Sequence, residues 1–210
     1  MKLDINKNKQ EYLALFRETG REGVEDLIIE LEKMHFFTAP ASAVHHLNTD
    51  GGLLQHSLNT YHAAIGIWEN MKSLCPHIAK EVTKDNIVIA SLLHDICKCD
   101  VYRKKKDSKS RFWSFGKEKT DFFASYDEFP IGHGEKSVIL ALCSGLIMTD
   151  SEIVAIRWHM GPWCVNMNSN DDRQSYRVAE SKYPLVTILQ TADTLVVFHR
   201  VCPEPAPRTL

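Results

Sequence analysis

The sequence predicts an all-α fold, a compact bundle of about six to eight helices. Apolar residues recur at steps of three and four through most of the 210 residues, whereas the alternation typical of strands is weak. Hydrophobic residues make up 44% of the chain and charged residues 25%, the balance of an ordinary globular domain. We therefore expect a single domain over residues 1–210, with its core at about 36–200 and loosely held ends at 1–8 and 202–210.

The first half of the chain is predicted to form four helices. Pro40 and a pair of glycines predict a loop at 38–52. The last of the four segments contains a nearly unbroken apolar run that suits a core helix or a core strand, and the start signal at Thr83 or Asp85 favours the helix. The segments with helical spacing are 10–19, 24–36, 53–74 and 85–98.

The second half begins with a change of character. Residues 100–130 are polar, aromatic and basic, which predicts a hairpin or an irregular excursion. Thr149 and Glu152 are spaced as a capping box for a following helix. The segment 161–182 is predicted as a loop with at most a short helix, and Pro184 suits the first turn of the final helix. The helical segments of this half are 134–146, 151–160 and 184–201.

Charge and hydropathy exclude several classes of protein. The net charge is −2, so no overall positive field attracts nucleic acid. No stretch approaches the ~18 apolar residues of a membrane-spanning helix, and the N-terminal segment lacks an apolar signal core. We expect a cytoplasmic protein without a membrane partner, and no pattern indicates its oligomeric state. The six scattered cysteines are expected to be free thiols, since Cys97 and Cys99 offer only half of a metal site and no second half follows.

Histidine and aspartate occur where the apolar pattern predicts the protein interior. Asp193 lies in an almost wholly apolar helix, and His94 and Asp95 end an apolar run. An unpaired buried carboxylate costs on the order of several kcal/mol, so these groups need cations, hydrogen-bond donors or a metal. A lone buried histidine is more often a hydrogen-bonded core residue, but several on separate helices can converge on a metal. The other histidines of this kind are His56, His133 and His159.

The order of these six residues resembles the HD superfamily of metal-dependent phosphohydrolases. Residues 92–98 read LLHDICK, close to the family's usual LLHDIGK, and 191–195 match its closing aspartate motif. Residues 39–58 are similar to the start of the HD domain in bacterial 3′→5′ exoribonucleases. Two positions depart from the usual pattern: Cys97 replaces the glycine of LLHDIGK, and Met160 stands where many relatives carry a further histidine.

The resemblance implies two divalent metal ions, which could be Mn, Fe, Ni, Co, Zn or Mg. Two such ions would activate a water molecule for attack on a phosphate ester. Adjacent residues 94 and 95 would point about 100° apart on one helix and so serve both ions. The first ion would be held by His56, His94, Asp95 and Asp193, and the second by His133, His159 and a bridging Asp95.

Further side chains near these motifs are candidates for catalysis and substrate binding. Asp95, Lys98 and His46 are expected to take part in catalysis. Lys98 could balance ligand charge or hold a substrate phosphate, but it could also be a surface lysine at a helix end. Trp163 could stack on a base, and the alternative is a core tryptophan under a loop. The substrate-binding candidates are His45, His46, Lys98, Arg103, Lys104 and Trp163. The histidines expected to be structural or exposed are His35, His62, His77 and His199, with His62 on a solvated helix face.

The function that we expect is hydrolysis of a phosphate ester in a nucleotide, another phosphorylated small molecule or a short nucleic acid. One alternative is a 3′→5′ exonuclease on single-stranded nucleic acid. Another is a non-catalytic module that binds a nucleotide or a metal, although a retired site should have lost some of its ligands. A di-iron oxygenase is a further reading, because a few HD proteins oxidise their substrates.

The basic stretch at residues 102–119 yields a first prediction. It holds eight basic and two acidic side chains. Cations and aromatic rings suit phosphates and bases, although charge runs are usually solvated surface. The aromatic residues between the charges are Tyr102, Phe112, Trp113 and Phe115. If the stretch holds substrate, replacing Lys104, Lys105 and Lys106 by serine should raise KM and weaken its salt dependence, with kcat and metal content similar. Unchanged kinetics on every active substrate would make the stretch an ordinary surface loop.

Overall fold

The computed structural model confirms the all-α fold and describes residues 3–104, 122–125 and 129–199. Eight helices in these ranges have nine residues or more: α1 (Ile5–Glu18), α2 (Val24–Lys33), α3 (Gly52–Leu74), α5 (Lys84–Leu93), α7 (His133–Cys143), α8 (Asp150–Trp158), α9 (Asn170–Lys182) and α10 (Pro184–His199). The short helical elements are η1 (Phe36–Thr38), α4 (Ile78–Glu81), α6 (Lys98–Val101) and η3 (Gly161–Cys164).

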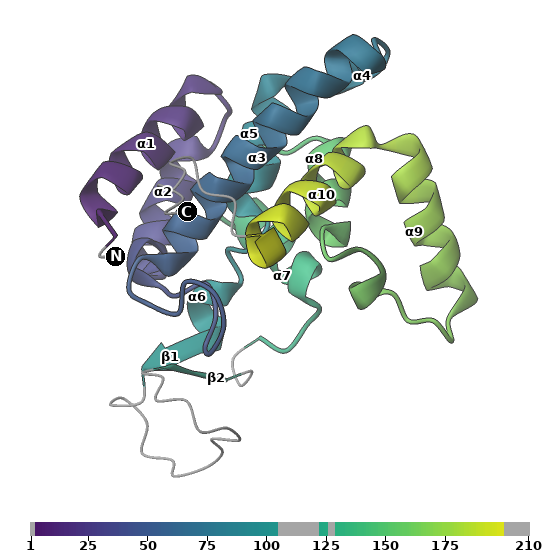
Figure 1. Ribbon diagram of the computed structural model, residues 1–210. Coiled ribbons are helices and arrows are strands. Elements are labelled where there is room, and N and C mark those ends of the chain that lie inside the picture. The colour runs from purple at the N-terminus through teal and green to yellow at the C-terminus, as the bar shows by residue number, and fades with distance from the viewer. Residues whose placement is uncertain (1–2, 105–121, 126–128, 200–210) are drawn as a thin grey trace, which may run out of the picture.

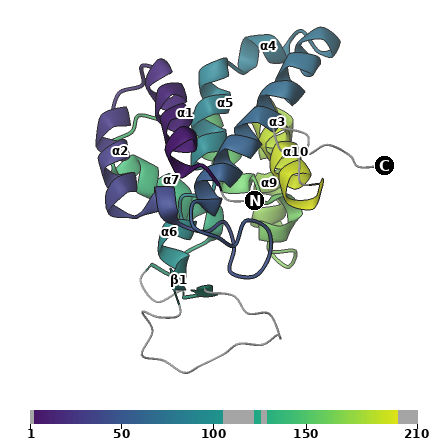
Figure 2. The same cartoon turned by 60° about the vertical axis from the view of Figure 1, so that its left-hand side comes forward.

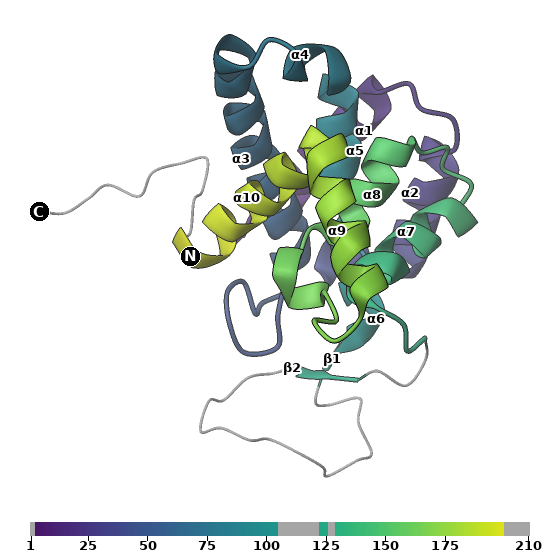
Figure 3. The same ribbon diagram turned by 90° about the vertical axis from the view of Figure 1, so that its right-hand side faces the viewer.

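Helix α3 forms the middle of the bundle. It packs against α5 and α10, and α10 also packs against α8. In Figure 1, α1 and α2 lie on one side of α3 and α9 lies on the other. Figure 2 shows α1 beside α5, and Figure 3 shows α9 alongside α8 and α10. The central helices α3, α5, α8 and α10 therefore bring together segments that are far apart in the sequence.

Helix α1 begins at Ile5, earlier than its apolar spacing predicts. The Asp4 carboxylate accepts a hydrogen bond from Lys7 N at 3.0 Å and caps the helix start. Tyr12 is fully buried, and its hydroxyl donates to the carbonyl oxygen of Leu92 in α5 at 3.1 Å. The expectation that residues 1–8 are loosely held is therefore wrong for the part that lies in α1.

In the first half of the chain, two predicted helices end at least three residues earlier in the structure than their apolar patterns suggest. Helix α2 ends at Lys33, because His35 adopts a left-handed backbone conformation with φ of 59°. Helix α5 ends at Leu93, so residues 94–97 form a turn instead of the last helical turn. Because α5 ends at Leu93, the side chains of residues 94–97 project from a turn and not from a regular helix.

The prediction of a mostly irregular segment at 161–182 is wrong. It contains η3 and the 13-residue helix α9. Helix α9 is strongly polar and buries only Tyr176 and Ala179, so it lacks the apolar stripe from which a helix is predicted. The sequence does carry one signal for α9, the N-cap residue Ser169, whose hydroxyl accepts a hydrogen bond from Asp172 N at 3.2 Å.

A two-stranded hairpin interrupts the helices, in agreement with one interpretation of residues 100–130. Strand β1 (Tyr102–Lys104) pairs antiparallel with β2 (Phe122–Ala124). The pair follows α6 directly and projects beyond the helical bundle (Figure 1). Residues 105–121, which hold most of the basic stretch, and the tail at 202–210 lie outside the described residues.

Hydropathy and cysteine chemistry can be assessed over the same described ranges. None of the helices there is long and apolar enough to cross a membrane. The five cysteines within these ranges are free thiols, as expected.

A buried carboxylate joins the N-terminal helices to the second half of the bundle. Glu152 in α8 is fully buried and accepts two hydrogen bonds from Arg21, at 2.8 and 2.9 Å. It also accepts one from Asn86 Nδ2 in α5 at 2.8 Å. The same side chain completes the predicted capping box with Thr149. One side chain therefore connects α5, α8 and the loop between α1 and α2.

This arrangement predicts a large loss of stability for Glu152→Ala. The substitution leaves Arg21 and Asn86 without their acceptor and should lower the free energy of unfolding by roughly 3–5 kcal/mol. The matched control is Glu25→Ala. Glu25 also accepts two hydrogen bonds from one arginine, Arg17, at 2.7 and 2.9 Å, but that pair is exposed, so its loss should lower stability far less. Urea unfolding followed by circular dichroism measures both variants, and equal small losses would contradict the structural role of Glu152.

Candidate metal centre

The turn after α5 carries His94 and Asp95 into the interior. Ile96 N donates to Leu93 O at 3.2 Å and Lys98 N donates to Asp95 O at 2.9 Å, which closes the turn. Both His94 and Asp95 are buried. Helix α5 ends at Leu93, and the two side chains that follow meet: His94 Nε2 lies 3.3 Å from Asp95 Oδ2.

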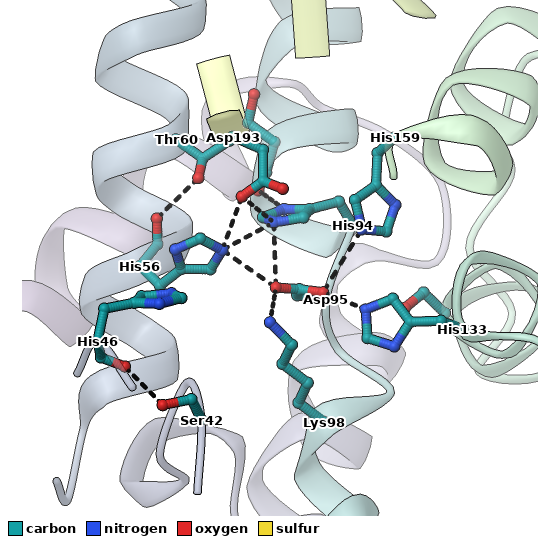
Figure 4. A network of polar contacts seen from close by, with 12 residues as sticks. Ser42, His46, His56, Thr60, His94, Asp95, Lys98, His133, His159 and Asp193 are labelled. Atoms are coloured by element: carbon teal, nitrogen blue, oxygen red, sulfur yellow. Dashed lines mark hydrogen bonds and ion pairs between the residues drawn. The ribbon is translucent and has the colours of Figure 1, made fainter. Parts of the chain in front are cut away.

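Two helices place His56 and Asp193 against this turn (Figure 4). His56 comes from α3, and its Nε2 atom lies 3.0 Å from His94 Nε2 and 3.0 Å from Asp95 Oδ2. Asp193 comes from α10, and its Oδ1 atom lies 3.2 Å from His56 Nε2 and 3.7 Å from His94 Nε2. Four side chains from three segments therefore direct their ligand-type atoms to one place.

His133 and His159 face the other oxygen of the Asp95 carboxylate. His133 Nε2 lies 2.6 Å from Asp95 Oδ1, and His159 Nε2 lies 3.6 Å from the same atom. His133 is the first residue of α7 and His159 follows the end of α8. Gly134 allows the two helices to meet, because a Cβ at this position would clash with the carbonyl oxygen of Arg157. The missing side chain of Gly134 thus places His133 beside His159.

Backbone carbonyls orient two of the imidazole rings. His94 Nδ1 lies 2.8 Å from Ser91 O, and His159 Nδ1 lies 2.7 Å from Ile156 O. In its neutral form, a ring that donates its Nδ1 proton to a carbonyl leaves Nε2 on the opposite side free to bind a metal ion. Both Nε2 atoms face the carboxylates, in the orientation that a metal ligand requires.

Mutual charge interactions shift the pKa values of the cluster. Burial alone would raise the pKa of Asp95, but Lys98 and His94 outweigh burial and hold it well below its usual range. Burial also opposes protonation of His94 and His133, yet Asp95 outweighs it and raises the pKa of each ring to about 10. At His159 burial prevails and lowers the pKa. The carboxylates therefore attract positive charge to this cluster, and a divalent cation meets the same requirement.

The donor atoms fit divalent metal ions. In each of three groups of side chains the ligand-type atoms all lie within 4.8 Å of one another. The buried Nε2 atom of His159 has no hydrogen-bond partner, as expected of an atom reserved for an ion. Imidazole nitrogen and carboxylate oxygen suit Zn, Fe, Mn, Ni and Co. The groups are His56, His94 and Asp95; His94, His159 and Asp193; and Asp95, Cys97 and His133, of which Cys97 was not assigned from the sequence.

Comparison with known proteins identifies the domain. The family model of the HD domain matches residues 53–196, a range that includes all six of these histidines and aspartates. The chain belongs to the HD domain family. Members of this family are generally metal-dependent phosphohydrolases and bind divalent metals. The match does not distinguish exoribonucleases from other members, and neither a curated protein nor a solved structure matches the chain.

Lys98 and His46 lie at the edge of the HD-domain centre. Lys98 Nζ is 2.5 Å from Asp95 Oδ2 and its side chain is 14% exposed, so it is not a surface lysine. The ring of His46 lies 5.2 Å from that of His56, centroid to centroid. Burial, together with the neighbouring His56 and Lys98, lowers the pKa of His46 to about 4. His46 is therefore neutral near pH 7.

The loop before α3 holds His46 in this position. Ser42 Oγ donates to His46 O at 2.9 Å, and Leu47 adopts a left-handed backbone conformation with φ of 50°. Gly52 allows the loop to approach the helix, because a Cβ there would clash with the carbonyl oxygen of Leu47. Non-glycine residues rarely adopt the left-handed conformation that Leu47 has, and those that do often lie at functional sites.

The remaining substrate-binding candidates are exposed or lie on the hairpin. His45 is exposed. Trp163 in η3 is 85% exposed, so its interpretation as a core residue is wrong. Arg103 and Lys104 lie on β1, where the structure describes the backbone, and their side-chain roles stay predictions.

The α3 face that carries His62 is covered by α1, although its polar residues predict a solvated face. Asn8 Nδ2 donates to Gln55 Oε1 at 2.7 Å, and Gln55 Nε2 donates to Asn59 Oδ1 at 2.8 Å. His62 itself is half-buried and its Nε2 atom lies 2.7 Å from Glu11 Oε1. Polar side chains on both helices satisfy one another, which a pattern of apolar residues cannot reveal.

The geometry predicts that metal content depends on Asp95 far more than on His62. Asp95→Ala should strip the protein of divalent metal, because this carboxylate contacts both halves of the centre. His133→Ala and His159→Ala should weaken mainly one metal position, by at least about tenfold. Elemental analysis of protein purified without chelator or affinity-tag metal measures these contents. His62→Ala is the control, and equal metal loss in His62→Ala and Asp95→Ala would contradict the assignment.

Proposed function

We propose that the protein is a metal-dependent phosphohydrolase with a two-metal centre. The observation that carries this proposal is the division of the ligand set between the two oxygens of Asp95. His56 and His94 face Oδ2, at 3.0 and 3.3 Å, whereas His133 and His159 face Oδ1, at 2.6 and 3.6 Å. A carboxylate approached from both sides in this way is suited to bridge two cations. Asp193 would complete the first position, beside His56.

Two cations in such a centre would supply an activated water molecule and neutralise the oxygens of a phosphate ester. The protein residues would hold and orient the reactants. Lys98 compensates the charge of Asp95 and places an ammonium at the edge of the centre, where a phosphate oxygen could accept a hydrogen bond from it. His46, neutral and held by its loop, would contact the same phosphate or the leaving oxygen. No side chain has to act as the nucleophile.

The substrate class that suits this centre is a nucleotide or another phosphorylated small molecule. A 3′→5′ exonuclease acting on single-stranded nucleic acid is the second candidate. Its support is the hairpin, because β1 follows α6 directly and α6 begins with Lys98. The basic stretch of the sequence therefore starts only a few residues from the edge of the centre. Oligonucleotides with a blocked 3′ end distinguish the two candidates, since only the exonuclease requires a free end.

A phosphate-ester screen tests the proposed function. Metal-stripped protein, reloaded with Mn²⁺, Co²⁺, Ni²⁺, Zn²⁺ or Mg²⁺, should hydrolyse at least one nucleotide, phosphomonoester or short oligonucleotide. His46→Ala should lower kcat/KM by roughly 100-fold while metal content is retained. His62→Ala is the control, because the ring of this histidine contacts Glu11 outside the centre and its loss should change kcat/KM little. Metal binding without hydrolysis of any ester would favour the non-catalytic module.

A further inference from the structure

Cys97 closes the turn that presents Asp95, and it is almost fully buried at 1% exposure. Its backbone N–H donates to the Ser137 hydroxyl in α7 at 3.3 Å. This hydrogen bond ties the turn to the helix whose first residue is His133. The position of the Cys97 side chain is therefore fixed relative to both Asp95 and His133.

The thiol lies against the His133 ring. Cys97 Sγ is 3.2 Å from His133 Nδ1 and 3.9 Å from His133 Nε2. The rings of His94 and His159 differ, because their Nδ1 atoms face backbone carbonyl oxygens. Three imidazoles of the centre have a described Nδ1 partner. For His94 and His159 this partner is a carbonyl oxygen, and for His133 it is sulfur.

We propose that the Cys97 thiolate is a ligand of the second metal position, together with Asp95 and His133. Their ligand-type atoms all lie within 4.8 Å of one another. At a tetrahedral zinc ion, bonds of about 2.3 Å to sulfur and about 2.0 Å to nitrogen or oxygen place the ligand atoms about 3.5 Å apart. Small side-chain adjustments therefore suffice. The unpartnered Nε2 atom of His159 faces the same carboxylate oxygen as His133, at 3.6 Å from Asp95 Oδ1.

Sulfur ligation gives the two metal positions different preferences. Binding breaks the S–H bond of Cys97, forms a sulfur–metal bond and releases the proton to solvent, with no change of oxidation state. Thiolate with imidazole favours Zn²⁺ and Co²⁺, whereas Mg²⁺ and Mn²⁺ prefer oxygen ligands. The first position, with His56, His94 and Asp193, contains no sulfur. The second position should therefore select a thiophilic cation.

Cobalt spectroscopy tests this inference, which rests on the proposed metal centre but not on the hydrolysis. Metal-stripped, reduced full-length protein is titrated with Co²⁺ in the wild type and in Cys97→Ser, Cys97→Ala and Cys99→Ser. A sulfur-to-cobalt charge-transfer band in the near ultraviolet should appear in the wild type and in Cys99→Ser. Cys99 is the matched control, because it is a buried thiol in the same segment and in none of the groups of ligand-type atoms.

Both Cys97 variants should lack the band while they keep the visible ligand-field bands of cobalt. Their affinity for the second Zn²⁺ should fall at least about tenfold, with Mn²⁺ affinity little changed. Circular dichroism checks that the variants fold, and two substitutions of different polarity guard against failure of either one. The sulfur ligand would be refuted, and the metal centre retained, by either of two results. One is a wild type that binds two Co²⁺ ions without the band, and the other is unchanged Zn²⁺ affinity in both Cys97 variants. A wild type that binds no Co²⁺ would overturn the metal centre as well.

Discussion

The buried Asp95 carboxylate is the constraint on which the rest of the structure depends. Four imidazoles and one ammonium lie within 3.6 Å of its two oxygens. A carboxylate at this depth without such partners would cost on the order of several kcal/mol. Its partners come from α3, from α7, from the end of α8 and from its own turn, so its charge is compensated only when these segments are correctly packed. Packing of the bundle and assembly of the site are therefore one requirement.

The end of α5 shows how the fold presents this carboxylate. The last carbonyls of a helix have no partner within the helix and must be satisfied by other groups. Ser91 O faces His94 Nδ1, Leu92 O accepts from the Tyr12 hydroxyl, and Leu93 O accepts from Ile96 N. A site histidine, the N-terminal helix and the turn itself thus share the capping of α5. Helix α1, which contributes no ligand, still holds the centre in place through Tyr12.

The candidate site could be predicted from the sequence because polar residues in apolar segments are costly. Asp193 stands out in α10 and the His94–Asp95 pair stands out at the end of α5 for this reason, and the structure brings all six predicted ligand residues together. What the sequence could not supply were contacts between polar groups of different helices. The contacts of α1 with Gln55 and His62, and the polar helix α9, leave no apolar stripe in the sequence from which they could be predicted. Cys97 was not assigned, because with Cys99 it offers only half of a metal site in the sequence and a buried thiol carries no cost that would mark it.

Imidazole rings in mutual contact limit how many protons can take the place of a metal in this centre. The ring centroids of His56 and His94 are 5.0 Å apart, those of His94 and His159 are 5.0 Å apart, and those of His133 and His159 are 5.4 Å apart. Each proton satisfies one ring and places a positive charge next to another ring, so the repulsion grows with every proton added. A divalent cation instead accepts lone pairs from several neutral rings at once and brings its charge to the carboxylates. Because the ligands meet only in the folded chain, such a cation also stabilises the native state, by about 2.7 kcal/mol at a free concentration of 100 times its Kd. Metal binding by these atoms would therefore stabilise the same helical bundle that brings them together.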